Sequence, residues 1–291
     1  MHAAILTYPG HFFMSALTVR SVRKFFPNID TITVLYDDIC AEAWPGYAQD
    51  VEQWMCSQSP ALDFKPYSTL PGIDKTSVGW WRQQLIKIYS DQLLPGDEWL
   101  VIDGDVVFEQ TFDYKITPVA RRPEVCDTNV AVMTANYVQR VLGINERYMT
   151  YDNTYAVTSS IPFRWMDRQL LQGLRNHVEQ KWNKNFVQLH MDWFNDQTIV
   201  AFWDPPERMI MSEWEIIEAY RHYVAHNDVS IKDVGSGYHT LTHTPGCWGW
   251  LFRHSCMKDQ DLGRKWFEHQ FITVPDTLWD KSTEWHTKNR V

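Results

Sequence analysis

The chain has 291 residues, enough to bury a core without disulfides or metals as staples. Its 15 tryptophans and aromatic content of 14% exclude a disordered protein, since disordered chains are poor in aromatic residues. The formal net charge of −9 argues against a general nucleic-acid binder, because neutralising phosphates requires a basic surface.

The cysteines and the hydropathy of the sequence indicate where in the cell the protein resides. The five cysteines are scattered, and none forms a C-x-x-C pair. An odd, scattered set is typical of free thiols in a reducing environment. The N-terminal residues lack the pattern of a signal peptide, and no window approaches the roughly 20 apolar residues that cross a bilayer. We therefore expect a cytoplasmic protein without a transmembrane segment, either a monomer or a homodimer.

The first 38 residues predict a strand, a helix and a second strand. Ala3–Tyr8 is a short apolar run closed by Pro9-Gly10. Apolar residues within Phe12–Phe26 fall three or four apart, as in a helix, and Thr31–Tyr36 is rich in β-branched residues. A strand-helix-strand crossover implies parallel strands and an α/β sheet.

The next segments continue this alternation. Val51–Phe64 is ambiguous, whereas Ser77–Leu94 has a clear helical period. After a Pro-Gly-Asp turn, Glu98–Ile102 predicts a strand that runs directly into Asp103-Gly104-Asp105, and Val106–Phe108 continues after it.

The second half of the sequence is less regular. Ser212 with Glu215 three residues later has the form of a helix-capping box. We expect strands at Val130–Ala135, Asp196–Phe202 and Met209–Met211, an extended segment at Tyr151–Ser160, a helix that starts at Pro162 and carries Leu170, Leu171, Leu174 and Val178, helices at Glu213–Val224 and Leu262–Phe271, and a partly alternating segment at Ile231–Thr242. Without a repeat or a long linker, the sequence predicts one domain, with a nucleotide-binding-like half at 1–125 and an acceptor half at 126–291.

The sharpest chemical feature is Asp103-Gly104-Asp105. Two carboxylates lie two residues apart at the carboxyl end of a predicted buried strand, where ligands bind in open α/β sheets. Gly104 allows a tight turn and a close approach to a ligand. Hard oxygen donors suit Mn²⁺ or Mg²⁺ completed by phosphate oxygens. The alternative is an ordinary surface turn, in which Asp and Gly are common.

Neither a P-loop nor a Gly-x-Gly-x-x-Gly fingerprint follows the first strand, so a P-loop kinase or a dinucleotide dehydrogenase is disfavoured. With these residues the chain resembles the nucleotide-sugar glycosyltransferases of the GT-A class, in which a Rossmann-like half ends in an Asp-x-Asp motif. The resemblance implies an α/β GT-A fold with a mixed sheet flanked by helices, and a metal that bridges the donor diphosphate.

The same resemblance implies a ligand set. His243 and Gly246 match the late His-x-x-Gly of glycosyltransferase family 8, in which the histidine is the third metal ligand and the glycine approaches the phosphate. The metal ligands would be Asp103, Asp105 and His243. The remaining donor-binding candidates are Thr7, Tyr8, Asp37, Arg82, Lys87, Gly104 and Gly246.

Two resemblances place the catalytic acid differently. Asp196-Gln197 resembles the late Asp-Gln pair of family 8, which sits under the sugar. Glu213-Trp214-Glu215 resembles a segment of less-studied microbial GT-A transferases that also carry an Arg-Gln-Gln-Leu-x-Lys helix. A structural reading is also open, because carboxylates in a first helical turn are stabilised by the helix dipole. All four side chains therefore remain catalytic candidates, and Trp214, Trp248 and Trp250 are candidate sugar platforms.

These observations predict a metal-dependent enzyme that transfers a hexose, most simply glucose or galactose, from a UDP-sugar to the hydroxyl of a carbohydrate or small-molecule acceptor. The family 8 likeness favours retention at the anomeric carbon. Two alternatives remain open. A nucleotidyltransferase shares the acidic metal ligands of an α/β half, and a non-catalytic carbohydrate-binding protein would explain the tryptophans.

Overall fold

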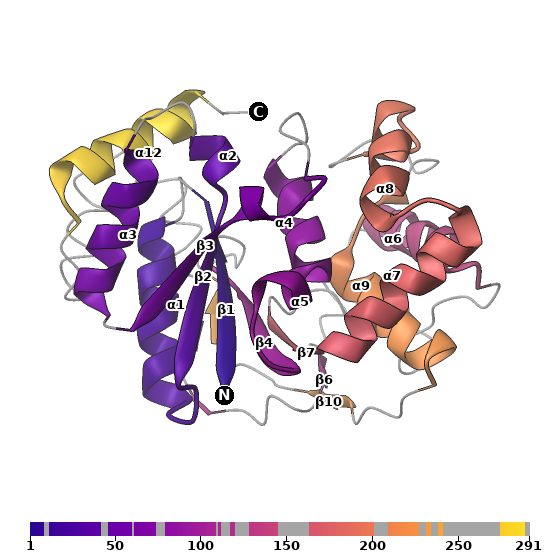
Figure 1. Ribbon diagram of the computed structural model, residues 1–291, viewed down its shortest axis with the longest axis horizontal. Coiled ribbons are helices and arrows are strands. Elements are labelled where there is room, and N and C mark those ends of the chain that lie inside the picture. The colour runs from indigo at the N-terminus through magenta and orange to yellow at the C-terminus, as the bar shows by residue number, and fades with distance from the viewer. Residues whose placement is uncertain are drawn as a thin grey trace. The chain divides into compact units, whose positions relative to one another are not determined.

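The computed structural model describes residues 1–8, 12–41, 46–59, 61–73, 79–108, 110–111, 117–119, 128–144, 163–200, 209–226, 231–233, 238–240 and 274–288. The chain divides into two compact units (Figure 1). Unit 1 comprises Met1–Ser68, Val101–Phe112 and Ser236–Val291, and unit 2 comprises Thr69–Leu100 and Asp113–Gly235. The two units interleave along the chain, and the single domain with a division after residue 125 stays a prediction.

A parallel sheet forms the centre of unit 1. Its strands are β1 (His2–Thr7), β2 (Thr31–Tyr36), β3 (Leu62–Pro66) and the second half of β4 (Glu98–Asp103). They lie in the order β3-β2-β1-β4, and the pairs β1–β2 and β2–β3 are parallel. This is the strand order of a Rossmann-like half, and nearly every residue of β1 and β2 is buried, as expected for a sheet covered on both faces.

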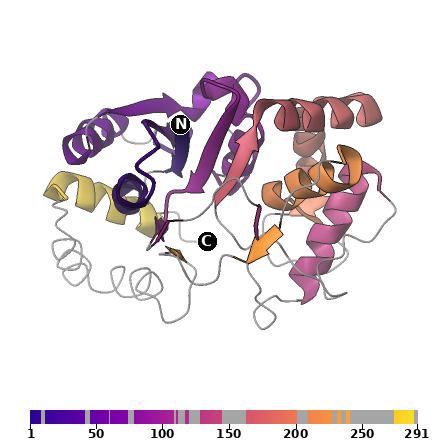
Figure 2. The same ribbon diagram turned by 90° about the horizontal axis from the view of Figure 1, so that it is seen from below.

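Helices cover this sheet. They are α1 (Phe12–Phe25), α2 (Asp38–Ala41), α3 (Tyr47–Gln58) and α12 (Asp276–Lys288), with a 3₁₀ turn η1 (Tyr67–Thr69). Helix α1 packs on β1 and on β5 (Val106–Phe108), which pairs antiparallel with β11 (Tyr238–Thr240). Figures 1 and 2 show α12 beside α3. The Trp279 ring of α12 stacks on the Phe13 ring of α1 with centroids 5.2 Å apart, so an aromatic contact joins the C-terminal helix to α1.

Unit 2 is mainly helical. Its elements are α4 (Gly79–Ile88), α5 (Ser90–Leu93), the first half of β4, β6 (Thr117–Val119), α6 (Thr128–Leu142), β7 (Phe163–Asp167), α7 (Arg168–Trp182), α8 (Phe186–Asn195), β8 (Ile199–Val200), β9 (Met209–Ile210), α9 (Glu213–Ala219), the π-helix η4 (Tyr220–Val224) and β10 (Ile231–Asp233). Strand β7 is the neighbour of β4, β8 pairs parallel with β9, and β10 pairs parallel with β6.

The predicted α/β class, with a mostly parallel sheet flanked by helices, is confirmed. The strands at 3–8, 31–36, 98–102 and 106–108 and the helix at 12–26 form within one residue or two of their predicted bounds. The helix predicted over Glu213–Val224 forms as α9 and η4, with Ser212 accepting from the Glu215 backbone N–H at 3.4 Å. Ambiguous residues 51–64 divide between α3 and β3.

Several predictions are wrong. Val130–Ala135 lies in helix α6, where Met133, Tyr137 and Val141 are buried at helical spacing; the predicted strand window was too short to show this period. The helix predicted from Pro162 begins only at Arg168, because β7 precedes it and Asp167 caps it. Of the strand predicted at Asp196–Phe202, Ile199–Val200 forms as β8, whereas residues 196–198 are not strand. Helix α8 before them was not predicted.

The helix predicted over Ser77–Leu94 is divided between α4 and α5 at Tyr89. Arg175 donates to the Ile88 carbonyl at 2.6 Å, so a side chain from α7 stabilises the backbone at this break. The extended segment predicted at 151–160 and the helix predicted at 262–271 lie outside the described residues.

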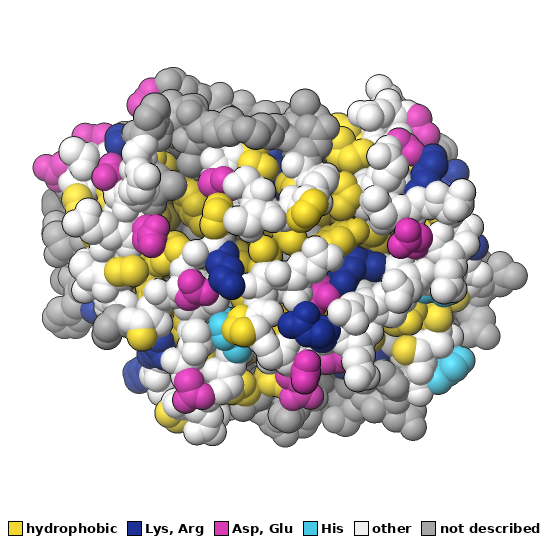
Figure 3. Space-filling model, viewed as in Figure 1, with side chains coloured by type: hydrophobic (Ala, Val, Ile, Leu, Met, Phe, Trp, Pro, Cys, Tyr) yellow, Lys and Arg dark blue, Asp and Glu magenta, His cyan; other side chains and the backbone are white. Residues whose placement is uncertain are grey.

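Two further properties concern the described residues as a whole. None of their helices is both long and apolar enough to cross a membrane. On the face shown in Figure 3, basic, acidic and apolar side chains are interspersed.

Candidate functional site

The turn formed by Asp103, Gly104 and Asp105, here called the Asp-Gly-Asp turn, follows β4 in unit 1 as predicted. The Thr18 hydroxyl on α1 donates to the Gly104 carbonyl at 2.9 Å. One hydrogen bond of this kind contributes about 1 kcal/mol and fixes the turn against the first helix. Asp105 is buried to 7% exposure, whereas Asp103 is half-buried.

Gly104 is required by a close approach within the protein. A Cβ at this position would lie 2.2 Å from the Leu6 carbonyl oxygen and 2.4 Å from the Ser15 hydroxyl. Its φ is not positive, so the requirement is steric. Because Gly104 at the end of β4 lies beside Leu6 at the end of β1, the carboxyl ends of these two strands meet at one edge of the sheet. Between β1 and β4 the strand order reverses, and ligands of open α/β sheets bind outside that point.

The predicted donor-binding residues at the ends of β1 and β2 belong to the same edge. The Thr7 side chain is buried and accepts a hydrogen bond from the Ser15 hydroxyl at 2.8 Å. The Asp37 backbone N–H donates to the Thr7 carbonyl at 3.0 Å, and the Asp37 carboxylate is buried. Tyr8 is half-buried. Unit 1 therefore brings Thr7 and Asp37 together with the Asp-Gly-Asp turn.

Two of the three predicted metal ligands belong to the described residues. Asp103 and Asp105 lie on either side of Gly104 and offer hard carboxylate oxygens, which fit Mn²⁺ or Mg²⁺. Within the described ranges no group of three or more His, Cys, Asp or Glu side chains is close enough to hold a metal. The predicted third ligand, His243, and the predicted phosphate-contacting Gly246 lie outside these ranges.

In unit 2 the fold joins two predicted segments that are 126 residues apart. The Lys87 ammonium on α4 lies 2.5 Å from the Glu213 carboxylate on α9, and both side chains are almost fully buried. The ammonium also lies 4.4 Å from the centroid of the Trp214 ring. Trp214 itself is buried, so the surface of this ring is covered by protein rather than open as the predicted sugar platform.

Further charged side chains are buried around this pair. Arg164 on β7 lies 3.6 Å from the Glu218 carboxylate and 6.0 Å from the Trp214 ring, and Arg221 lies 3.7 Å from Glu218. The buried charged residues of this part of unit 2 are Arg82, Lys87, Arg164, Glu213, Glu215, Glu218 and Arg221. Burying a charged side chain is costly unless the charge is paired. A group of several buried charged side chains is therefore characteristic of functional sites as well as of ion-pair networks.

Two of the four catalytic candidates are exposed. Asp196 and Gln197 follow the last residue of α8, and both side chains face solvent. The Asp196 carboxylate accepts from the Thr198 backbone N–H at 2.9 Å, and Gln197 has a φ of 60°, in the left-handed region that non-glycine residues seldom adopt. A left-handed residue just after the C-cap is a common way to end a helix, and the Gln197 N–H donates to the Phe194 carbonyl at 3.0 Å.

A buried tyrosine–histidine pair was not predicted. His190 Nδ1 donates to the Phe186 carbonyl at 2.6 Å, which leaves Nε2 to accept from the Tyr137 hydroxyl at 2.6 Å. Burial lowers the pKa of His190 from 6.5 to about 4, so the ring is neutral at pH 7. Burial, and secondarily the nearby Glu213 carboxylate, raises the pKa of Tyr137 well above its usual value. No local sequence signal indicated this pair, because helix α8, which carries His190, was not predicted.

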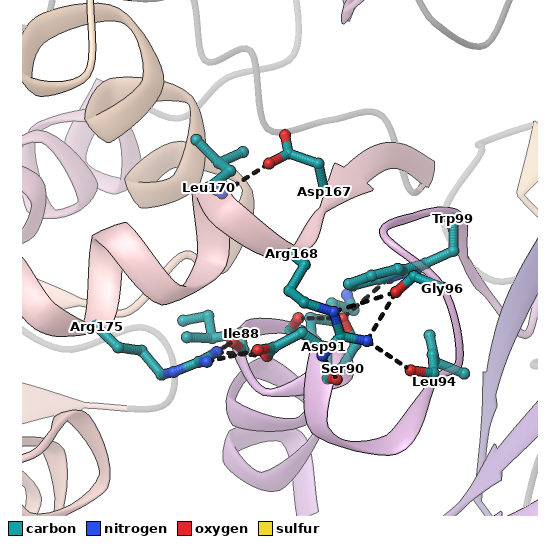
Figure 4. Close-up of polar contacts among 11 residues, drawn as sticks. Ile88, Ser90, Asp91, Leu94, Gly96, Trp99, Asp167, Arg168, Leu170 and Arg175 are labelled. Carbon is teal, nitrogen blue, oxygen red and sulfur yellow. Dashed lines mark hydrogen bonds and ion pairs between the residues drawn. The ribbon is translucent and has the colours of Figure 1, made fainter.

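A cluster of hydrogen bonds around Asp91 holds the residues that precede β4 (Figure 4). Arg175 binds the buried Asp91 carboxylate through two bonds of 2.6 and 2.7 Å. Arg168 donates to the carbonyls of Asp91, Leu94 and Gly96 at 2.6 to 3.1 Å, using the acceptors that the end of α5 leaves open. Arg168 therefore holds the turn from which β4 starts, and Arg175 holds the helical residues before that turn.

Comparison with known proteins adds the following. The galactosyltransferase LgtC in complex with donor and acceptor sugar analogues is 10% identical, with 97% of this chain and 100% of that chain covered and a TM-score of 0.43. Mouse xyloside xylosyltransferase 1 in its apo form is 10% identical, with 80% and 84% covered and a TM-score of 0.43. TM-scores below 0.5 are too low to carry a conclusion about this chain. None of the curated proteins matches the sequence.

A family model covers most of the chain. It is described as a family of unknown function, DUF6492, and it matches residues 14–228. The matched region runs from α1 to the residues after η4 and so includes the Asp-Gly-Asp turn and the Lys87–Glu213 pair. The chain belongs to the DUF6492 family.

Proposed function

We propose that this protein is a metal-dependent glycosyltransferase of the GT-A type, which moves a hexose from a UDP-sugar to the hydroxyl of a carbohydrate or small-molecule acceptor. One observation carries the proposal. The Asp-Gly-Asp turn is fastened beside the end of β1, at the point where the strand order reverses, by the Thr18 hydrogen bond and the close approach of Gly104 to Leu6. A diphosphate-bound metal is the ligand that two carboxylates suit at such a place.

Asp103 and Asp105, with His243 as the third ligand, would hold Mn²⁺ or Mg²⁺ at the donor diphosphate. The cation supplies Lewis acidity and neutralises the charge that develops on the leaving group. Thr7 and Asp37, which end β1 and β2 at the same edge, would contact the base and ribose, with Tyr8 beside them. Gly246 would approach the phosphates.

The remaining candidates would act on the sugar and the leaving group. Arg82 would add positive charge near the diphosphate. As its bond breaks, the anomeric carbon acquires oxocarbenium character, which a nearby carboxylate or amide stabilises. The candidates are Asp196 and Gln197, whose side chains are exposed, and Glu215 in the first turn of α9, whose side chain is buried. We propose that the transfer retains the configuration at the anomeric carbon. Lys87 and Glu213, the two remaining candidates, are bonded to one another.

Turnover of nucleotide sugars tests the proposal directly. The purified chain is incubated with Mn²⁺ and UDP-glucose or UDP-galactose, with and without a panel of sugar acceptors, and the released nucleotide is separated by chromatography. We expect UDP release that requires the metal and rises with an acceptor. Release of pyrophosphate from a nucleoside triphosphate and a sugar phosphate would instead identify a nucleotidyltransferase, and no turnover with either substrate set would refute an enzymatic role.

Variants locate the activity. Asp105→Ala should abolish metal-dependent turnover while the protein stays folded, since its side chain would supply a ligand to the cation. Glu52→Gln, which removes one exposed carboxylate from α3 in the same unit, is the matched control and should keep full activity. Full activity of Asp105→Ala in excess Mn²⁺ would show that the metal assignment is wrong.

A further inference from the structure

The Lys87–Glu213 pair joins α4 to the start of α9 inside unit 2. Their charged atoms lie 2.5 Å apart, and the two side chains are 2% and 4% exposed. Gln84 on the same helix also contacts this residue, because its side-chain Oε1 accepts from the Glu213 backbone N–H at 3.4 Å. Two positions of α4, one helical turn apart, therefore contact Glu213.

The surroundings of Lys87 complete its environment. The ammonium lies over the face of the Trp214 ring, 4.4 Å from its centroid, and this cation–π geometry stabilises a desolvated charge. A buried ammonium is costly to desolvate, and here a carboxylate and an aromatic face offset that cost. Removing either member of the pair would take the opposite charge at 2.5 Å away from the other buried charge.

We propose that Lys87 is a positioning residue, which holds Glu213 and through it the first turn of α9 that carries Glu215, and that it does not contact the donor diphosphate. This inference rests on the proposed glycosyltransferase function. It assigns Glu213 to the pair and leaves the exposed Asp196 and Gln197 and the buried Glu215, which is 1% exposed, as the catalytic candidates.

The geometry explains how a distant charge would matter for catalysis. Glu213 and Glu215 belong to the same turn, whose cap is the bond from the Glu215 N–H to Ser212. Displacing Glu213 moves the backbone that carries Glu215, and a displacement of about 1 Å near reacting groups can lower kcat by roughly 100-fold. Loss of Lys87 should therefore appear in kcat, whereas loss of a diphosphate contact would appear in the KM for the donor.

A double-mutant cycle tests the pair itself. Lys87→Met and Glu213→Met each remove one charge and keep an unbranched side chain of similar length. Either single change should raise the unfolding equilibrium constant roughly 100-fold or more, because it strands a buried charge. The double variant should return to within roughly tenfold of the wild type, since an apolar pair of similar volume replaces the ion pair well.

The chain offers a matched control in the same unit. The Lys184 ammonium lies 2.6 Å from the Asp192 carboxylate, a distance similar to that of the buried pair, but these two side chains are 47% and 35% exposed. The same cycle with Lys184→Met and Asp192→Met should show less than roughly fivefold coupling, as exposed pairs do. Equal coupling in the two cycles, or none at Lys87 and Glu213, would overturn the proposed role of the buried pair.

Kinetics with UDP-sugar and Mn²⁺ then separate positioning from binding. Measured where every variant is folded, Lys87→Met should lower kcat at least tenfold with the donor KM within twofold of the wild type, and the double variant should regain most of kcat. A tenfold rise in donor KM would instead make Lys87 a diphosphate ligand, and an unchanged kcat would make the pair merely structural. Either result overturns the inference. Absence of turnover in the wild type would refute the proposed function instead, and the stability cycle would still report on the pair.

Discussion

Replacing Gly104 with alanine tests the packing on which the account of the Asp-Gly-Asp turn depends. The new Cβ would lie 2.2 Å from the Leu6 carbonyl oxygen, which is backbone in the centre of the sheet, and 2.4 Å from the Ser15 hydroxyl. Because strand β1 cannot yield at low cost, the turn must move. Forcing a methyl group into a close-packed site costs about 1–3 kcal/mol, and losing the Thr18 bond to the Gly104 carbonyl adds about 1 kcal/mol.

We therefore expect Gly104→Ala to lower the free energy of unfolding by about 2–4 kcal/mol. Urea unfolding followed by tryptophan fluorescence measures the change. Gly96→Ala is the control, because Gly96 has open space but a φ of +81°, so alanine there incurs mainly the conformational cost of about 1 kcal/mol. If Gly104→Ala unfolds at the urea midpoint of the wild type, the turn is not held as described.

Three further predictions concern unit 2. Native His190 stays neutral down to about pH 4, whereas the unfolded chain protonates it below 6.5, so the unfolded state binds more protons in this window. Acidification from pH 6.5 to 4 should therefore lower the free energy of unfolding by up to about 3 kcal/mol. Urea titrations at several pH values should show this pH dependence in the wild type and lose it in His190→Gln. Asp91→Ala leaves the mostly buried Arg175 without its carboxylate and should cost about 3–5 kcal/mol by the same titration at pH 7, so a loss below 1 kcal/mol would contradict the described packing. Asp167→Ala removes the cap that accepts from the Leu170 N–H at 2.7 Å and should cost about 1 kcal/mol, with a parallel loss of helical circular dichroism.

Periodicity was sufficient for the elements at 3–8, 12–26, 31–36 and 98–108 because each of them obeys its own local rule. Thr31–Tyr36 is β-branched and buried on both faces, and Phe12–Phe25 keeps one apolar stripe. The helix at Val130–Ala135 was missed for the opposite reason. Valines and alanines fill a window shorter than two turns, and only Tyr137, Val138 and Val141 beyond it show the helical period.

The residues of the candidate site could be predicted from the sequence, but the contacts that hold them in place could not. Asp103 and Asp105 could be placed at a sheet edge because they follow a strand. Nothing local in the sequence shows that Ser15 and Thr18 hold that edge, since polar residues in a helix point to solvent as often as to a neighbour. The Lys87–Glu213 contact depends on how α4 and α9 pack, which is a tertiary property of residues 126 positions apart.

Metal-dependent binding of UDP is the measurement that tests the central claim most directly. Thermal unfolding of the wild type is followed with UDP and Mn²⁺, with UDP and a chelator, and with Mn²⁺ alone. A ligand that binds only the native state raises its stability, so we predict stabilisation by UDP that requires Mn²⁺ and is lost in Asp103→Asn and Asp105→Asn variants that remain folded. Equal stabilisation by UDP in the chelator, or no stabilisation by UDP at all, would contradict a donor site built on the Asp-Gly-Asp turn.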